Sequence, residues 1–307
     1  MAVHHVTLRS RLEQAARSNE PAVLQNALRW AIDELTKANP LAPPQPESPF
    51  TTEPGSGVLV CLLGTFRVLK GGLAVSLRSG GKVEQMLMRL AFHARDGMSR
   101  DELLGDLWPS AELALAAQSL NTLVSWVNRT LYNGPAGCAL IVRSFGRYRL
   151  NTDGGVRVDV LEFDASVSAG DLRARAGDRP GAISSYEQAV ALYTGDLVAA
   201  SDVDHLIERE RLRARYLRVL AELSEDWFTM GSYDLALSEA YDLLAREPCR
   251  EDAHRMAMRC FVRMDQRAQA VRQYRLCRDV LAIEFGVAPE RTTDALFDLI
   301  RSSPQSV

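Results

Sequence analysis

Several hallmarks of common protein classes are missing from this 307-residue sequence. It has only five cysteines, which are scattered along the chain and form no C-x-x-C pair. An odd, dispersed set of this kind predicts reduced thiols and excludes a disulfide framework. The longest apolar run, Val58–Leu63, is far too short to cross a bilayer, and the N-terminus has no apolar stretch of a secretory signal. We therefore expect a cytoplasmic protein without a membrane partner.

The motifs of common enzyme classes are missing as well. The stretch Ser79-Gly80-Gly81-Lys82 does not have the G-x-x-x-x-G-K-[ST] spacing of a phosphate-binding loop. The five histidines are dispersed, and Cys249 with His254 would give a zinc ion only two ligands. The sequence thus predicts neither an enzyme nor a bound cofactor.

The composition is that of a globular protein, but the charge is unevenly distributed. Hydrophobic residues make up 47% and charged residues 24% of the chain, and the net charge is −3. Residues 58–160 carry 12 Lys and Arg against 8 Asp and Glu, whereas residues 161–307 carry 19 against 25. A basic segment beside an acidic one weakly favours a polyanion-binding module joined to a second domain.

Changes in composition and in hydrophobic periodicity divide the sequence into four parts. Residues 39–57 contain six prolines and no Lys or Arg, which predicts an extended linker. Residues 1–38 before it have apolar residues at helical spacing and predict a helical hairpin. We expect a small α+β domain at residues 58–160 and a helical domain at residues 161–307.

Residues 58–160 predict the element order of a winged helix-turn-helix. Short strands joined by a Gly71-Gly72 turn come first, and a helix follows over residues 82–94. Ser99 and Glu102 form a capping box that begins a second helix, and the third helix runs over residues 113–131. Residues 140–150 then predict a closing β-hairpin. A fold of this kind presents its third helix to the major groove of DNA, and a small α+β domain without a nucleic-acid role is the alternative.

From residue 161 onward the pattern is helical and repeats. Gly231, Ala236 and Ala240 lie 34 positions before Asp265, Ala270 and Tyr274, as in tetratricopeptide repeats. An earlier copy begins at Gly177 with Ala182 and Tyr186, and an insertion separates it from the next. The charged stretch 202–215 in that insertion predicts a solvated helix face. The whole fold is therefore expected to be mainly α, with a winged helix-turn-helix followed by a tetratricopeptide-like repeat domain.

Four stretches give this chain a family resemblance from Leu62 to about Leu299. They are 63–68 (LGTFRV), 98–109 (MSRDELLGDLWP), 146–163 (GRYRL, then VDVLEF) and 284–289 (EFGVAP). In this order they resemble the SARP-type bacterial transcriptional activators, which join an OmpR-like winged helix to a tetratricopeptide "bacterial transcriptional activator" domain. The resemblance implies a nucleoid-associated regulator that binds double-stranded DNA and contacts RNA polymerase. It also implies that the repeat domain mediates protein contacts or oligomerisation. The polymerase contact is expected in the loop Pro109, Ser110, Ala111 and Glu112.

The third helix departs from the family pattern. The family has a basic run where this chain has Ser125–Leu131, and Trp126 and Asn128 stand at usual arginine positions, as does Ala117 upstream. Only Arg129 remains, and each lost cation removes one phosphate contact. An arginine introduced at position 128 is therefore expected to tighten DNA binding.

Two functions remain open at this point. In the first, the chain is a DNA-binding transcriptional regulator, and its contact residues lie on the third helix, the hairpin and the start of the first helix. The predicted DNA-contacting residues are Gln118, Ser119, Asn121, Thr122, Ser125, Trp126, Arg129, Arg143, Arg147, Arg149, Arg78 and Lys82. In the second, the chain is a protein-interaction adaptor whose degenerate winged helix does not bind DNA. Trp126 fits either function, because an aromatic residue beside a helix core often serves packing.

Overall fold

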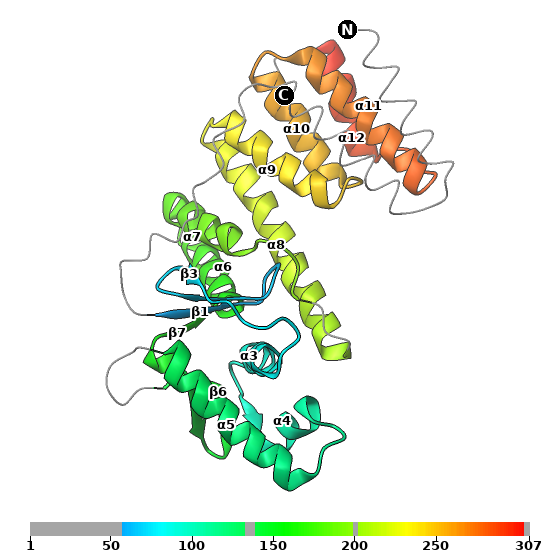
Figure 1. Ribbon diagram of the computed structural model, residues 1–307. Helices are drawn as coiled ribbons and strands as arrows, with labels where there is room; N and C mark the ends of the chain where they lie inside the picture. Colours follow the sequence, from blue (N-terminus) through cyan, green and yellow to red (C-terminus); the bar gives the residue numbers. More distant parts are fainter. Residues whose placement is uncertain (1–56, 133–138, 199–201, 304–307) are drawn as a thin grey trace. The chain divides into compact units, whose positions relative to one another are not determined.

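The computed structural model describes residues 57–132, 139–198 and 202–303 (Figure 1). The predicted hairpin at residues 1–38 and nearly all of the predicted linker lie outside the described residues. Contacts divide the chain into two compact units, which we call the N-terminal unit, Pro46–Tyr216, and the C-terminal unit, from Leu217 onward. Each unit is described by itself below.

Two small sheets frame the N-terminal unit. The first has the strand order β3-β2-β1-β7, built from Leu73–Ala74, Arg67–Lys70, Val58–Cys61 and Val156–Val158. Strands β1 and β7 run parallel, with Val58 opposite Val156, and the other pairs are antiparallel. The second sheet has the order β4-β6-β5, built from Met98–Ser99, Arg147–Leu150 and Ile141–Ser144. Strand β1 is buried along its whole length, because it is central in its sheet.

Three helices fill the space between and beside these sheets. They are α3 (Lys82–Phe92), α4 (Arg100–Leu107) and α5 (Leu113–Leu131). Helix α4 begins at the predicted capping box, in which the Ser99 side chain accepts from the Glu102 amide and Glu102 accepts from the Ser99 amide. Leucines from all three helices, such as Leu87, Leu103 and Leu120, are fully buried against one another. The same apolar stripe that forms this core fixes which face of α5 remains outside.

The first two repeat helices are continuous with the winged helix. After the short 3₁₀ helix η1 (Thr152–Gly154) and β7, helix α6 (Asp159–Arg175) begins at once and packs against α7 (Arg179–Leu192). The segment after α7 returns to the first sheet: the amide of Gly64 donates to Asp196, and that of Val198 donates to Leu62. Helices α6 and α7 thus belong to the same compact unit as the winged helix-turn-helix (Figure 1).

Helix α8 (Val203–Thr229) begins in the N-terminal unit and ends in the C-terminal unit. The C-terminal unit continues with α9 (Tyr233–Arg246), α10 (Glu251–Arg263), α11 (Arg267–Glu284) and α12 (Arg291–Ser302). Helix α10 packs against both α9 and α11. None of the helices in the described ranges is long and apolar enough to span a membrane.

Backbone geometry supports the predicted repeats. Gly177, Gly231 and Asp265 lie between paired helices and all have positive φ values, of 79°, 79° and 59°. The small residues five positions later, at 182, 236 and 270, are alanines with no exposed surface. Equivalent positions thus have equivalent conformation and burial, as stacked helix pairs require.

The predicted fold class, a winged helix-turn-helix followed by helical repeats, is confirmed. Helix α5 has the predicted bounds, and the strand that follows the Gly71-Gly72 turn, β3, is only Leu73–Ala74. The charged stretch 202–215 lies largely on α8 and has ion pairs between neighbouring turns, Glu208–Arg211 and Glu210–Arg213, as a solvated helix face does. Arg211 and Arg215 in addition bind the buried carboxylate of Asp164 on α6, which was not predicted. The four-part domain division remains a prediction, while contacts place α6 and α7 with the winged helix.

Candidate nucleic-acid interface

The exposed side of α5 carries all seven residues that were predicted from the third helix. We call this set the α5 face; it consists of Gln118, Ser119, Asn121, Thr122, Ser125, Trp126 and Arg129. Each of these residues is exposed, while Leu120, Val127 and Leu131 on the opposite side are buried. At 100° per residue the seven positions form one continuous stripe along three turns of helix. The structure therefore brings these predicted residues together on one surface.

The α5 face is polar and almost uncharged. Ser119 and Thr122 donate their hydroxyl protons to the carbonyls of Leu115 and Gln118, one turn earlier. Their lone pairs remain on the surface as acceptors. Arg129 is the one cation of the face, and its Nη2 lies 3.5 Å from the Ser125 hydroxyl. Such groups can hydrogen-bond to base edges, but they attract phosphate only at the Arg129 end.

Trp126 is a surface residue, with 43% of its area exposed. At the other end of the helix, Leu113 and Leu115 are also exposed, at 69% and 60%. The α5 face thus has apolar groups beside its polar stripe. This combination suits a surface that contacts the methyl groups or sugars of a duplex as well as its base edges.

Asn128, which stands where the family usually has an arginine, has a structural role that the sequence did not predict. Its Nδ2 donates to the carbonyl of Ile141 at 3.0 Å, and its Oδ1 accepts from the Ile141 amide at 2.8 Å. The side chain therefore holds the first residue of β5 against α5. An arginine at position 128 would lose both bonds, so the expectation that Asn128→Arg simply adds a DNA contact is withdrawn.

The β5–β6 hairpin carries three arginines and no acidic residue. Arg143 is exposed and its guanidinium carbon lies 5.7 Å from the centre of the Tyr148 ring. Arg147 instead donates to the carbonyls of Asp96 and Gly97 and to the Glu102 carboxylate, at 2.9 to 3.2 Å. Arg149 forms an ion pair with Asp153. The three side chains therefore differ: Arg143 is exposed beside the Tyr148 ring, Arg147 joins the hairpin to the start of α4, and Arg149 is paired with Asp153.

The remaining predicted cations lie near the start of α3. Arg78 is exposed in the loop that precedes the helix. Lys82 donates to Gln85 and lies 6.0 Å from the centre of the Trp108 ring. Lys70, which sequence reasoning did not single out, donates to the carbonyl of Thr130 in the last turn of α5. A cation there stabilises the negative end of the helix dipole.

The predicted polymerase-contacting loop forms the turn between α4 and α5. Its four residues, Pro109, Ser110, Ala111 and Glu112, are all exposed. Glu112 occupies the N-cap position of α5 but makes no side-chain capping bond. Its carboxylate is therefore available to a partner without loss of a helix cap.

The winged helix is held to α6 by a buried carboxylate, Asp159. Its two oxygens accept from the amides of Leu62, Leu63 and Val160, all at 2.8 Å. Burial raises the pKa of Asp159 to about 6, and the amides of Leu63, Leu62 and Val160 act in the opposite direction. The bonds from Leu62 and Leu63 span 97 and 96 positions of sequence, and they join the residues just after β1 to the first turn of α6. We call Asp159 with these three amides the joint.

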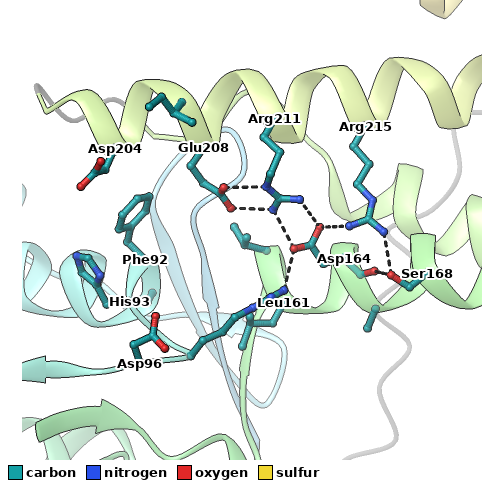
Figure 2. Close-up of a pocket in the computed structure, with 15 residues that line it drawn as sticks. Phe92, His93, Asp96, Leu161, Asp164, Ser168, Asp204, Glu208, Arg211 and Arg215 are labelled. Carbon is teal, nitrogen blue, oxygen red and sulfur yellow. Dashed lines mark hydrogen bonds and ion pairs between the residues drawn. The ribbon is translucent and has the colours of Figure 1, made fainter.

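A second buried carboxylate, Asp164, lies one turn further along α6. Figure 2 shows it between Arg211 and Arg215 of α8, and Arg95 from the turn before β4 binds it as well. Four N–H groups reach its two oxygens at 2.7 to 3.1 Å, so its acceptor sites are filled. Arg211 also forms an ion pair with Glu208, one turn earlier on α8. A cavity of about 710 Å³ opens beside this cluster, with Phe92 and Ile207 among its apolar walls.

The described residues contain no group of three His, Cys, Asp or Glu side chains arranged to hold a metal ion. What they offer instead is a continuous polar helix face, a cationic hairpin and an exposed turn. These three features lie on the helix-turn-helix portion of the N-terminal unit, where α4, α5 and β6 appear together in Figure 1.

Comparison with known proteins matches both parts of the fold. Residues 158–301 match the family model of the bacterial transcriptional activator domain. The regulatory protein DnrI of Streptomyces peucetius is 27% identical over 233 residues, which cover 73% of this chain and 85% of DnrI. The regulatory protein AfsR of Streptomyces griseus is 25% identical over 249 residues, or 80% of this chain, but the match spans only 25% of AfsR.

A solved structure has the same fold. The structure of Mycobacterium tuberculosis EmbR, in complex with a low-affinity phosphopeptide, aligns with a TM-score of 0.58 and 22% identity. The alignment covers 81% of this chain and 67% of EmbR. At this identity the likeness concerns the fold, which is a winged helix with a helical-repeat domain.

Proposed function

Since this chain is a transcriptional regulator of the SARP type, with a bacterial transcriptional activator domain at residues 158–301, we propose that its α5 face and β5–β6 hairpin bind promoter DNA. The observation that carries this proposal is the continuous exposure of all seven residues of the α5 face. A helix with one buried and one polar exposed side, on a helix-turn-helix scaffold, is the element that enters the major groove.

The chemistry of the face assigns a role to its members. Gln118 lies at the N-terminal end of the stripe and can donate to and accept from adenine in a bidentate pair. Thr122 and Ser125 lie one turn apart on the same side and present hydroxyl acceptors. Arg129 lies near the C-terminal end of α5 and binds a phosphate or a guanine. Recognition then depends on hydrogen bonds more than on charge.

Phosphate contacts come from residues around the helix. Arg143 and Arg78 are exposed, and neither forms a salt bridge with another of the described residues. Arg147 and Arg149 already have partners in the protein, so we assign Arg147 to holding the hairpin in place. With few free cations, affinity for duplex DNA should be modest and should fall with salt.

The test uses a duplex selected from a random 30-base-pair pool by the wild-type protein. Thr122→Ala removes a hydroxyl from the α5 face and should weaken binding to the selected duplex about tenfold. Thr229→Ala is the matched control, because Thr229 is also exposed and donates to the carbonyl four residues earlier, in the C-terminal unit. The control should bind as the wild type does. Equal affinity of both variants would exclude a role for the α5 face, and selection of no duplex would favour the adaptor function.

We also propose that the turn Pro109–Glu112 contacts RNA polymerase. The support is its complete exposure beside α5 and the absence of a capping bond from Glu112 among the described contacts. Glu112→Ala should reduce activated transcription in a purified system while leaving duplex affinity unchanged. Asp101→Ala, at another exposed acidic position in the same domain, serves as the control. Loss of DNA affinity in Glu112→Ala would show that the turn only supports the fold.

For the helical repeats we propose protein contacts, either with a second copy or with another protein. The C-terminal unit has a cavity of about 370 Å³ between α8, α9 and α10, lined by Arg218, Glu222, Arg250 and Asp252 among others. Charged side chains of both signs around an open cavity suit a polar protein segment. Sedimentation of the wild type and of Arg218→Glu tests self-association, which the charge reversal should weaken if this surface is used.

A further inference from the structure

The tip of the β5–β6 hairpin carries a phenylalanine that the fold does not use. Phe145 is fully exposed, with a relative exposure of 103%, which is the highest among the large apolar residues of the described part of the chain. Its ring stacks on no other aromatic ring of the described residues. Most large apolar side chains are at least partly covered, and a phenylalanine that stands entirely in solvent contributes nothing to the folded state.

The backbone at this position makes the choice of residue more unusual. Ser144 and Arg147 are paired in the ladder, so Phe145 and Gly146 form a two-residue turn. Their φ values are 50° and 78°, both in the left-handed region. Turns of this type favour Asn-Gly or Asp-Gly, and a bulky residue at positive φ is an outlier. Neither hairpin formation nor packing therefore accounts for phenylalanine here.

The surroundings of the hairpin tip indicate a ligand that is anionic and contains stacked aromatic rings, as duplex DNA does. The hairpin strands contain three arginines and no acidic residue, and exposed Arg143 lies two residues before Phe145. DNA-binding proteins that kink the duplex insert an apolar wedge between base pairs from the minor groove, with cations on either side. The α5 face has only one cation, so its electrostatic attraction to the DNA phosphates is weak. An apolar contact, whose strength does not depend on salt, would add to the binding free energy.

We propose that Phe145 inserts as a wedge into the minor groove beside the major-groove site of α5, unstacking a base step and bending the DNA. This inference rests on the proposed DNA-binding function and adds to it a specific contact and a deformation. It also predicts a preference for a flexible pyrimidine–purine step at the position the tip reaches, because such steps unstack most easily.

The experiment uses the wild-type-selected duplex, labelled with dyes at its ends for bending and with 2-aminopurine at the flexible step. Phe145→Asn is the main variant, because Asn-Gly fits the turn better and the hairpin should fold at least as well. It should weaken binding on the order of tenfold, reduce the bend and abolish the 2-aminopurine signal. The slope of affinity against salt should stay that of the wild type, since no cation is lost. Phe145→Leu keeps an apolar tip and should retain most of the affinity and bend.

A comparison with Arg143→Ala distinguishes a wedge from a charge contact. That variant should lower the salt slope by about one and leave the 2-aminopurine signal in place. Wild-type affinity, bend and signal in Phe145→Asn would overturn the wedge while the proposed function stands. Loss of transcription activation in Phe145→Asn with unchanged DNA binding would also overturn it and indicate a protein partner at the tip. Failure of the wild type to bind any duplex would refute both proposals.

Discussion

The joint and the α5 face use polar side chains in opposite ways. At the joint, Asp159 is buried and both of its oxygens accept from backbone amides, so no capacity is left for a ligand. On the α5 face, Gln118, Ser125 and Arg129 are exposed and make few bonds within the protein. Polar groups that are saturated internally stabilise the fold, and polar groups that are not saturated remain available for recognition. On this basis we distinguish the structural role of Asp159 from the proposed DNA-contacting role of the α5 face.

The joint should be the most sensitive point of the N-terminal unit. Asp159→Ala leaves the amides of Leu62 and Leu63 buried without acceptors and should lower the free energy of unfolding by roughly 3–5 kcal/mol. Urea unfolding measures this, with Asp153→Ala as the control, because Asp153 is exposed and its ion pair is with Arg149 on the surface. The control should stay within about 0.5 kcal/mol of the wild type. A similarly small effect for Asp159→Ala would mean that the joint does not hold the unit together.

Acid should affect the two compact units in opposite directions. In the C-terminal unit, burial lowers the pKa of His254 to about 4, and its ring accepts from Gln273 while donating to the Pro248 carbonyl. Because the unfolded histidine takes up its proton near 6.5, the stability that neutral His254 contributes is lost as the pH falls from 6.5 to 4. Asp159 has a raised pKa, so the folded state binds its proton first and gains stability from pH 6 down to 4.

These two shifts correspond to changes of roughly 3 kcal/mol each, with opposite signs. Hydrogen exchange of each unit between pH 7 and 4, followed by mass spectrometry, measures them separately. The variants His254→Gln and Asp159→Asn should each remove the pH-dependent change from its own unit. A pH response that survives in both variants would assign it to other groups.

The charge cluster around Asp164 should have the next largest effect. Asp164→Ala deprives Arg215 and Arg95 of their shared carboxylate, and Arg211 keeps only Glu208. We expect a loss of roughly 2 kcal/mol, because the lost hydrogen bonds are charge-assisted but the arginines reach solvent. Thermal unfolding of this variant against Asp153→Ala measures the effect. A melting temperature equal to that of the control would show that the cluster does not contribute.

Local signals in the sequence predicted much of the fold. The capping box at Ser99 predicted the start of α4, and the apolar stripe at Leu120 and Val127 predicted the orientation of α5, because both signals depend on residues within a few turns. The partners of Asp159 and Asp164 were not predicted, since they lie tens of positions away and no local pattern marks them. Asn128 was misinterpreted for a related reason: its bonds to the Ile141 peptide depend on the tertiary fold.

The hairpin gives a smaller contrast within the proposed DNA-binding surface. Arg147→Ala removes bonds to Asp96, Gly97 and Glu102 and should cost roughly 1–2 kcal/mol of stability. Arg143→Ala, two positions before Phe145, truncates an exposed side chain and should change stability by less than about 0.5 kcal/mol. Urea unfolding of the pair measures the difference. If Arg143→Ala is the more destabilising of the two, the assignment of structural and DNA-contacting roles is reversed.

The central claim is that duplex DNA binds at the α5 face and the hairpin, and salt dependence tests it most directly. The affinity of the wild type for its selected duplex is measured over a series of salt concentrations, beside Arg129→Ala, Arg143→Ala and the double variant. Each single variant should lower the slope of log affinity against log salt by about one, and the double variant by about two. Arg291→Ala, at an exposed position in the C-terminal unit, should leave the slope unchanged. A slope that the double variant does not alter, or no binding by the wild type at low salt, would contradict the account.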